Sequence, residues 1–265
     1  MKNKILFAAM LFFVANIVYS QKKNLDLYLL IGQSNMAGRG TVEAQDTTAY
    51  PRVLTLDENN KWVPAKDPIH FDKTVAGVGL GRTFGIKMAK ANPEKTIGLI
   101  PCAVGGSSID AWMPGGFHEQ TQSHPWDDME KRLKIALQSG EVKGILWHQG
   151  ESDSNPESCA EYKDKLKDLI FRVRELAGNE HIPFVAGEFG RFKIKENKKQ
   201  YPNQSLSPAE IVMKSTIDLM KEDKNAAFVS SWGLDHKGDN THFDSKSYRT
   251  LGKRYAKKMI KLQRK

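Results

Sequence analysis

Short apolar runs alternate along this chain with segments that carry apolar residues every three or four positions. The apolar runs cover residues 25–31, 96–101, 142–147, 182–188 and 226–230, and the helical segments cover residues 80–91, 126–138, 157–176, 208–221 and 245–262. Apolar runs without alternation are typical of strands buried on both faces, as in a parallel sheet covered by helices. The strict order of strand and helix predicts an α/β fold of three layers, with a five-stranded, mainly parallel, doubly wound sheet and helices on both faces.

One long segment, residues 41–79, departs from this alternation. It contains two short apolar stretches, Val53-Leu54-Thr55-Leu56 and Trp62-Val63. We interpret the segment as an excursion that carries a small hairpin over the sheet.

The first twenty residues have the pattern of a secretory signal peptide. Lys2 and Lys4 precede an apolar core at residues 5–18, and Val18-Tyr19-Ser20 precedes a candidate cleavage point. The core is short for a membrane span, so we predict cleavage and a secreted or periplasmic protein, with an uncleaved N-terminal anchor as the alternative. Residues 1–20 are then the signal, and residues 21–265 are predicted to form a single domain.

The chain is basic, with a formal net charge of +9. Its excess of lysine and arginine is concentrated in residues 191–199 and 246–265. Binding to nucleic acid or to another polyanion is one interpretation. No aromatic residues alternate with these charges as in a base-stacking surface. We therefore interpret the two segments as a solvated loop and the wet face of a last helix, and expect neither a nucleic-acid partner nor a membrane partner beyond the targeting signal.

Two cysteines, Cys102 and Cys159, follow the signal segment. In an oxidising compartment they could pair, but two cysteines do not make a disulfide scaffold, and the sequence does not decide the question. Neither has the spacing of a metal ligand.

Polar segments follow four of the five predicted strands, and all four strands end at the same edge of the sheet. The segments are Gly32-Gln33-Ser34-Asn35-Met36, Val104-Gly105-Gly106-Ser107-Ser108-Ile109, Trp147-His148-Gln149-Gly150-Glu151-Ser152-Asp153 and Gly238-Asp239-Asn240-Thr241-His242-Phe243. In open α/β sheets, ligands bind outside the carboxyl ends of the strands. A functional site is therefore expected where these segments meet.

Three residues of these segments have the chemistry of a serine hydrolase. A serine hydroxyl needs an imidazole to take its proton and an acid to orient that imidazole. Ser34 supplies the hydroxyl, and His242 lies three residues after Asp239. Each also has an ordinary interpretation: Ser34 as a helix N-cap, Asp239 as a turn residue and His242 as a surface imidazole. Asp235 and His236 lie close by and could be mistaken for the acid and the base.

The two middle segments offer further candidate groups. Gly105-Gly106 fits no phosphate-loop pattern. Gly106 is interpreted as a turn residue with positive φ, as a residue whose exposed backbone N–H binds an oxyanion, or as both. Gln149 could donate its side-chain N–H to an oxyanion. His148 is a base or a core histidine, and Glu151 is a helix N-terminal acid or a triad acid.

Together these segments resemble the SGNH hydrolase superfamily, and more closely its sialate O-acetylesterase-like branch, which includes the acetylxylan esterases of carbohydrate esterase family 6. Residues 32–40 are similar to the nucleophile block of that branch nearly letter for letter, and residues 147–153 to its third block. The second and last blocks match residues 104–109 and the ending Asp239-Asn240-Thr241-His242. The resemblance implies the flavodoxin-like SGNH fold for essentially the whole mature chain.

Carried over residue by residue, the resemblance implies Ser34 as nucleophile, His242 as base and Asp239 as its orienting acid, with Glu151 as the alternative acid. It implies an oxyanion hole built from the Ser34 N–H, the Gly106 N–H and the Gln149 side chain, with no metal and no organic cofactor. The expected function is a secreted esterase that removes O-acetyl groups from a saccharide or polysaccharide of the acetylxylan type, through an acetyl-enzyme. The alternatives are a sialate O-acetylesterase with the same chemistry, or a carbohydrate-binding protein whose chemistry has lapsed. Trp112 and Trp126 are candidate sugar-stacking faces or packed aromatics.

Overall fold

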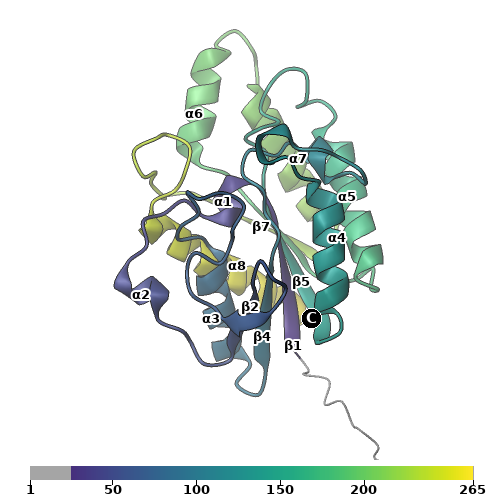
Figure 1. Ribbon diagram of the computed structural model, residues 1–265. Helices are drawn as coiled ribbons and strands as arrows, with labels where there is room; N and C mark the ends of the chain where they lie inside the picture. Colours follow the sequence, from purple (N-terminus) through teal and green to yellow (C-terminus); the bar gives the residue numbers. More distant parts are fainter. Residues whose placement is uncertain (1–24, 265) are drawn as a thin grey trace, which may run out of the picture.

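The computed structural model describes residues 25–264 of the chain (Figure 1). Its centre is a seven-stranded sheet of order β3-β2-β4-β1-β5-β6-β7, in which β3 runs antiparallel to β2 and every other pairing is parallel. The strands are β1 (Leu25–Gly32), β2 (Val53–Leu56), β3 (Trp62–Pro64), β4 (Thr96–Pro101), β5 (Gly140–His148), β6 (Phe184–Gly187) and β7 (Ala226–Val229).

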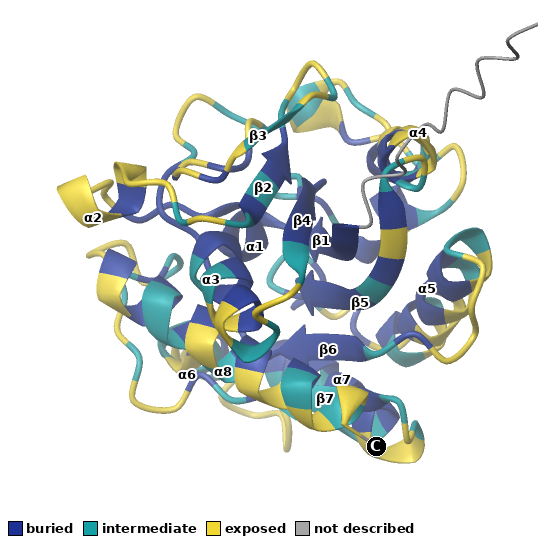
Figure 2. Cartoon of the chain, turned by 90° about the horizontal axis from the view of Figure 1, so that it is seen from below, coloured by how far each residue is buried: buried dark blue, intermediate teal, exposed yellow. Residues whose placement is uncertain are grey.

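Helices cover both faces of this sheet, as the alternation of the sequence predicts. One face packs against α3 (Gly81–Ala91) and α8 (Ser245–Gln263), and the other against α4 (Pro125–Ala136), α5 (Tyr162–Leu176) and α7 (Pro208–Glu222) (Figure 1). In β1, Leu29 and Ile31 belong to the core under α4, α5 and α7, whereas Tyr28 and Leu30 belong to the core under α3 and α8. Successive strand side chains point to opposite faces, so a strand between two helical layers must be apolar throughout. Strand β1 is accordingly buried along its whole length, and β4 and β5 are buried except near their amino ends (Figure 2).

The shorter elements lie in the connections. They are the helices α1 (Ser34–Ala37), α2 (Ala44–Thr47) and α6 (Arg191–Gln200) and the 3₁₀ helices η1 (Ile109–Trp112) and η2 (Glu119–Thr121). No helix within residues 25–264 is both long and apolar enough to cross a membrane. The expected signal peptide, residues 1–20, lies outside the described residues.

The prediction of five strands is wrong, because the hairpin of residues 41–79 joins the sheet instead of lying over it. Strands β2 and β3 pair antiparallel as expected, but Val53 also pairs in parallel with Ile97 of β4. Without this pairing, the outer backbone groups of β4 would form an unpaired sheet edge. The hairpin therefore extends the sheet from five to seven strands.

The prediction of a solvated loop at residues 191–199 is also wrong, because this segment forms helix α6. Phe192 and Ile194 pack against the two cores, and the buried Asn197 donates to Ser154 O at 2.9 Å and accepts from Ala209 N at 2.9 Å. These few anchoring side chains are spaced among lysines, so the amphipathic pattern is weak in the sequence. The prediction for the last helix is confirmed, since α8 covers residues 245–263.

Two further expectations concern buried side chains. Cys102 and Cys159 are both buried and both free, so they form no disulfide. Trp112 and Trp126 are 0% and 5% exposed and belong to the core, so neither offers a face for sugar stacking.

Candidate active site

Ser34 is placed by the sharp turn between β1 and α1. Gly32 has a φ of +133°, and a Cβ at this position would lie 2.2 Å from His148 O of the neighbouring strand. Only glycine tolerates both constraints. Gln33 N then donates to His148 O at 3.0 Å, and Ser34 begins α1 directly above the carboxyl end of β1.

Ser34, His242 and Asp239 form a chain of hydrogen bonds. Ser34 Oγ lies 3.0 Å from His242 Nε2, and His242 Nδ1 lies 2.7 Å from Asp239 Oδ2. The N-cap position of α1 is Gln33, so the Ser34 hydroxyl contacts the imidazole and does not cap the helix. This is the order of groups that lets an imidazole take a proton from a serine while a carboxylate orients the ring.

The pKa shifts of His242 and Asp239 fit a base and its orienting acid. Burial alone would raise the pKa of Asp239, but hydrogen bonds from the His242 N–H, the His242 ring and the Thr241 N–H outweigh it and lower the pKa to about 2. Burial lowers the pKa of His242, and the Asp239 carboxylate offsets only part of that effect. At neutral pH, His242 is therefore uncharged and Asp239 is ionised.

Glu151, the other candidate acid, lies beside this chain of hydrogen bonds and is not part of it. Its Oε1 accepts from Asn35 Nδ2 at 2.5 Å, and the structure places Asp239, not Glu151, in hydrogen-bonding contact with the His242 ring. Burial raises the pKa of Glu151 to about 7, with the Asn35 hydrogen bond opposing the shift.

The other candidate histidines have structural surroundings. His148 is fully buried, its Nδ1 lies 2.9 Å from Tyr255 Oη, and burial lowers its pKa to about 3, so it is a core histidine. His236 Nδ1 accepts from the Gly238 and Asn240 N–H groups and so holds the turn before His242.

Gly106 is a turn residue with positive φ, as the first of its two sequence interpretations predicts. Its φ is +91°, and a Cβ would lie 2.7 Å from Gln120 Oε1, so glycine is required. Among the residues that the structure describes, no protein group accepts a hydrogen bond from Gly106 N or from Ser34 N. The loop is tied to the nucleophile turn through Val104 N, which donates to Gly32 O at 3.0 Å.

The structure contradicts the expected role of Gln149. Its Nε2 donates to Ser107 O at 3.1 Å and to the Asp153 carboxylate, and its Oε1 accepts from Tyr162 Oη at 2.8 Å. A primary amide has two hydrogens, and both are used within the protein. Gln149 therefore has no donor left for an oxyanion, and it instead fastens the second polar segment to the third.

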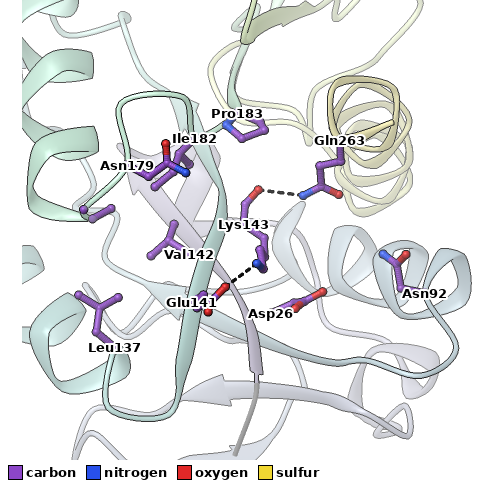
Figure 3. Close-up of a pocket in the computed structure, with 12 residues that line it drawn as sticks. Asp26, Asn92, Leu137, Glu141, Val142, Lys143, Asn179, Ile182, Pro183 and Gln263 are labelled. Carbon is purple, nitrogen blue, oxygen red and sulfur yellow. Dashed lines mark hydrogen bonds and ion pairs between the residues drawn. The ribbon is translucent and has the colours of Figure 1, made fainter. Parts of the chain in front are cut away.

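A hollow at the other end of the sheet is separate from these residues. Figure 3 shows it at the amino ends of β1 and β5, with Asp26, Glu141 and Lys143 among its lining residues. Lys143 Nζ lies 2.6 Å from Glu141 Oε2, and Gln263 Nε2 donates to Lys143 O at 2.8 Å. Ser34 follows the opposite end of β1, so this hollow takes no part in the site.

Comparison with known proteins agrees with the geometry. Residues 24–261 match the family described as carbohydrate esterase, sialic acid-specific acetylesterase. The chain belongs to this family.

Relatives support the assignment to this acetylesterase family. A probable carbohydrate esterase of Arabidopsis thaliana is 30% identical over 249 residues, which cover 85% of this chain and 86% of the relative. A crystal structure of an Arabidopsis thaliana protein has a TM-score of 0.76 at 26% identity, covering 90% of this chain and 98% of the other. The crystal structure of NanS has a TM-score of 0.72 at 17% identity, covering 92% and 98%, which shows a shared fold. The protein is thus a carboxylic ester hydrolase of the carbohydrate acetylesterase kind, with the predicted SGNH-type α/β fold.

The candidate site also includes residues that the sequence analysis did not identify. Asp72 Oδ2 accepts from Gly105 N at 2.8 Å and from Arg39 Nη2 at 2.6 Å, and both side chains of this ion pair are buried. Asp72 therefore fixes the peptide that precedes Gly106. It comes from residues 41–79, where no motif marks it, while Arg39 lies within the matched nucleophile block.

Proposed function

We propose that this protein is a secreted serine esterase that removes O-acetyl groups from a polysaccharide of the acetylxylan type, with Ser34 as nucleophile. The observation that carries the proposal is the hydrogen-bonded chain from Ser34 Oγ through His242 to Asp239. Such a chain activates a hydroxyl that is otherwise a weak nucleophile.

The proposed reaction has two steps. Ser34 Oγ attacks the acetyl carbonyl while His242 Nε2 takes its proton, and the same proton passes to the departing sugar oxygen as the acetyl-enzyme forms. Water then attacks the acetyl-enzyme, His242 takes one of its protons and returns it to Ser34 Oγ, and acetic acid leaves and ionises to acetate in solvent. The Ser34 and Gly106 N–H groups, which have no protein acceptor within residues 25–264, would bind the negative carbonyl oxygen in both steps.

An activity screen tests this function directly. The purified chain would be assayed on acetylated xylan, acetylated sialic acid and a chromogenic acetate, with release of acetate measured. A serine-reactive phosphonate should inhibit the reaction and label Ser34, as peptide mass mapping can check. Absence of turnover on all three substrates would contradict the proposal and favour a lapsed, binding-only protein.

The pH dependence of the reaction should follow His242. The neutral imidazole is the active base, so kcat/KM should rise with pH through the pKa of His242 and then level off. Because burial lowers that pKa, the midpoint of the rise should fall below the ordinary histidine value of about 6.5. A midpoint above that value, measured as kcat/KM on the chromogenic acetate, would contradict a buried, uncharged base.

The extended substrate is proposed because an exposed aromatic lies on the loop that carries Asp239 and His242. Trp232 is 69% exposed, and its backbone is held by Ser230 Oγ at 3.1 Å and by Arg254 Nη2 at 3.0 Å. It follows β7, which is three strands from β1, or about 14 Å at the usual strand spacing. A single sugar at Ser34 would not span that distance, whereas a polysaccharide chain would.

Replacing Trp232 with alanine should therefore raise KM on acetylated xylan by about two- to tenfold, the scale of one aromatic contact. Kinetics on the chromogenic acetate should stay unchanged. Phe171→Ala is the matched control, since Phe171 is 65% exposed on α5, remote from the site loop. Equal KM values for Trp232→Ala and the unmodified protein on xylan would remove the argument for an extended substrate.

A further inference from the structure

Asn35 is a fully buried amide whose hydrogen-bonding groups are all used. Its Nδ2 donates to Glu151 Oε1 at 2.5 Å and to Thr241 O at 3.0 Å. Its Oδ1 accepts from Tyr248 Oη at 2.7 Å and from Phe243 N at 3.4 Å. An amide has two donor hydrogens and two acceptor lone pairs, so Asn35 is saturated.

Two hydrogen-bond partners of Asn35 flank His242 in the sequence. Thr241 and Phe243 are the residues directly before and after the histidine, and Asn35 itself directly follows Ser34. The contact between Ser34 Oγ and His242 Nε2 therefore lies next to two hydrogen bonds that join Asn35 to the two neighbours of His242. Those two bonds connect the loop to α1.

Glu151 and Tyr248 hold the Asn35 amide in its orientation. Glu151 follows β5 and Tyr248 belongs to α8, so two separate segments fix the amide. Because the ionised Glu151 carboxylate only accepts while Tyr248 donates, the opposite orientation of the amide would place its oxygen against a carboxylate oxygen. The orientation that suits these partners is also the one that binds the His242 loop.

We infer that Asn35, oriented by Glu151, is a positioning residue that sets the approach of His242 to Ser34. The inference rests on the proposed serine esterase function. It also assigns Glu151 a role that differs from that of a triad acid: the carboxyl acts on His242 only through the Asn35 amide.

The variant Asn35→Asp tests this inference with almost no change of shape. Assayed well above the raised pKa of Glu151, this variant replaces the Nδ2 donors with an oxygen that faces two acceptors, the Glu151 carboxylate and Thr241 O, so the loop should move away from α1. A misplacement of about 1 Å can cost about 10²-fold in rate, and we expect kcat on the chromogenic acetate to fall by about that factor. KM should change by less than about twofold, since Asn35 is 0% exposed and does not reach substrate.

A second substitution should rescue this variant. In the double variant Asn35→Asp, Glu151→Gln, the new glutamine amide can donate to the new aspartate, which restores one hydrogen bond with its polarity reversed. We expect kcat to recover by about tenfold over Asn35→Asp. A merely structural loss would not be reversed by changing Glu151.

Asn197→Asp is the matched control. Asn197 is also a buried asparagine with one backbone acceptor and one backbone donor as partners, but it lies in α6 and contacts Ser154 and Ala209. The Asn197→Asp substitution should lower the melting temperature and leave kcat of the folded protein unchanged. If Asn35→Asp does not fold, Tyr248→Phe removes a single hydrogen bond to Asn35 Oδ1 and should lower kcat by a smaller factor at unchanged KM.

The outcomes separate this inference from the proposed function. An unchanged kcat in Asn35→Asp, or a double variant no faster than Asn35→Asp, would overturn the positioning role while Ser34→Ala remained inactive. If Asn35→Asp does not fold, an unchanged kcat in Tyr248→Phe would overturn it. Activity that persists in Ser34→Ala would instead overturn the function on which the role depends.

Discussion

Replacing Ser34 with alanine is expected to lower kcat on a chromogenic acetate by about 10⁴–10⁶-fold, the range found when the nucleophile of a serine hydrolase is removed. The variant keeps the backbone N–H of residue 34 and the base, but no hydroxyl can attack the carbonyl. The Ser34 hydroxyl makes one hydrogen bond, to His242, so its loss should leave the fold intact. Steady-state kinetics and a thermal melt on the same preparation measure both effects.

The phosphonate provides an independent check on the same residue. Ser34→Ala should take up no label, whereas the unmodified protein should be labelled at Ser34. Residual activity within tenfold of the unmodified protein, with the melt unchanged, would exclude Ser34 as the nucleophile.

Neutralising Asp239 should have the second largest effect. We expect Asp239→Asn to lower kcat by about 10³–10⁴-fold, because an amide at this position no longer stabilises the protonated imidazole and favours the wrong tautomer of His242. Asp239 Oδ2 lies 2.7 Å from His242 Nδ1, and the pKa of the carboxyl is lowered to about 2, so it is ionised throughout the assay range.

Glu151→Gln is the control for the Asp239→Asn prediction. A glutamine at position 151 can still accept from Asn35 Nδ2, so we expect its kcat to stay within about tenfold of the unmodified protein. A loss in Glu151→Gln that exceeds the loss in Asp239→Asn would make Glu151 the triad acid. Both variants should be compared at the same pH, since burial raises the pKa of Glu151 to about 7.

The sequence by itself determined the layered architecture and the place of the site. The apolar runs 25–31, 96–101, 142–147 and 182–188 predict strands buried on both faces, and the structure has such strands in β1, β4, β5 and β6. Because parallel strands end at one edge, the segments after them must meet there. Ser34, Asp239 and His242 do meet, as a chain of hydrogen bonds, because their place follows from the order of strands and helices.

The edges of the fold required the tertiary structure. The hairpin of β2 and β3 could have covered a face or extended the sheet, and its pattern is the same in both cases. The position of the hairpin is decided by β4, a strand about 40 residues further along the chain. The outer backbone groups of β4 would be unpaired if β2 did not join the sheet. Helix α6 was missed for a related reason, since Phe192, Ile194 and Asn197 acquire their partners only from distant segments.

The same limit applies to the finest details of the site. Gln149 carries two donor hydrogens, and the sequence cannot show that Ser107 O and Asp153 take them before any substrate does. Nor can it show that Asn35 binds both neighbours of His242, some 206 residues away. Periodicity and motifs determine which backbone segments converge, because burial of apolar surface acts on whole faces of strands and helices. Which polar atoms pair there depends on separations of about 3 Å between side chains from different segments, and only the packed tertiary structure sets those separations.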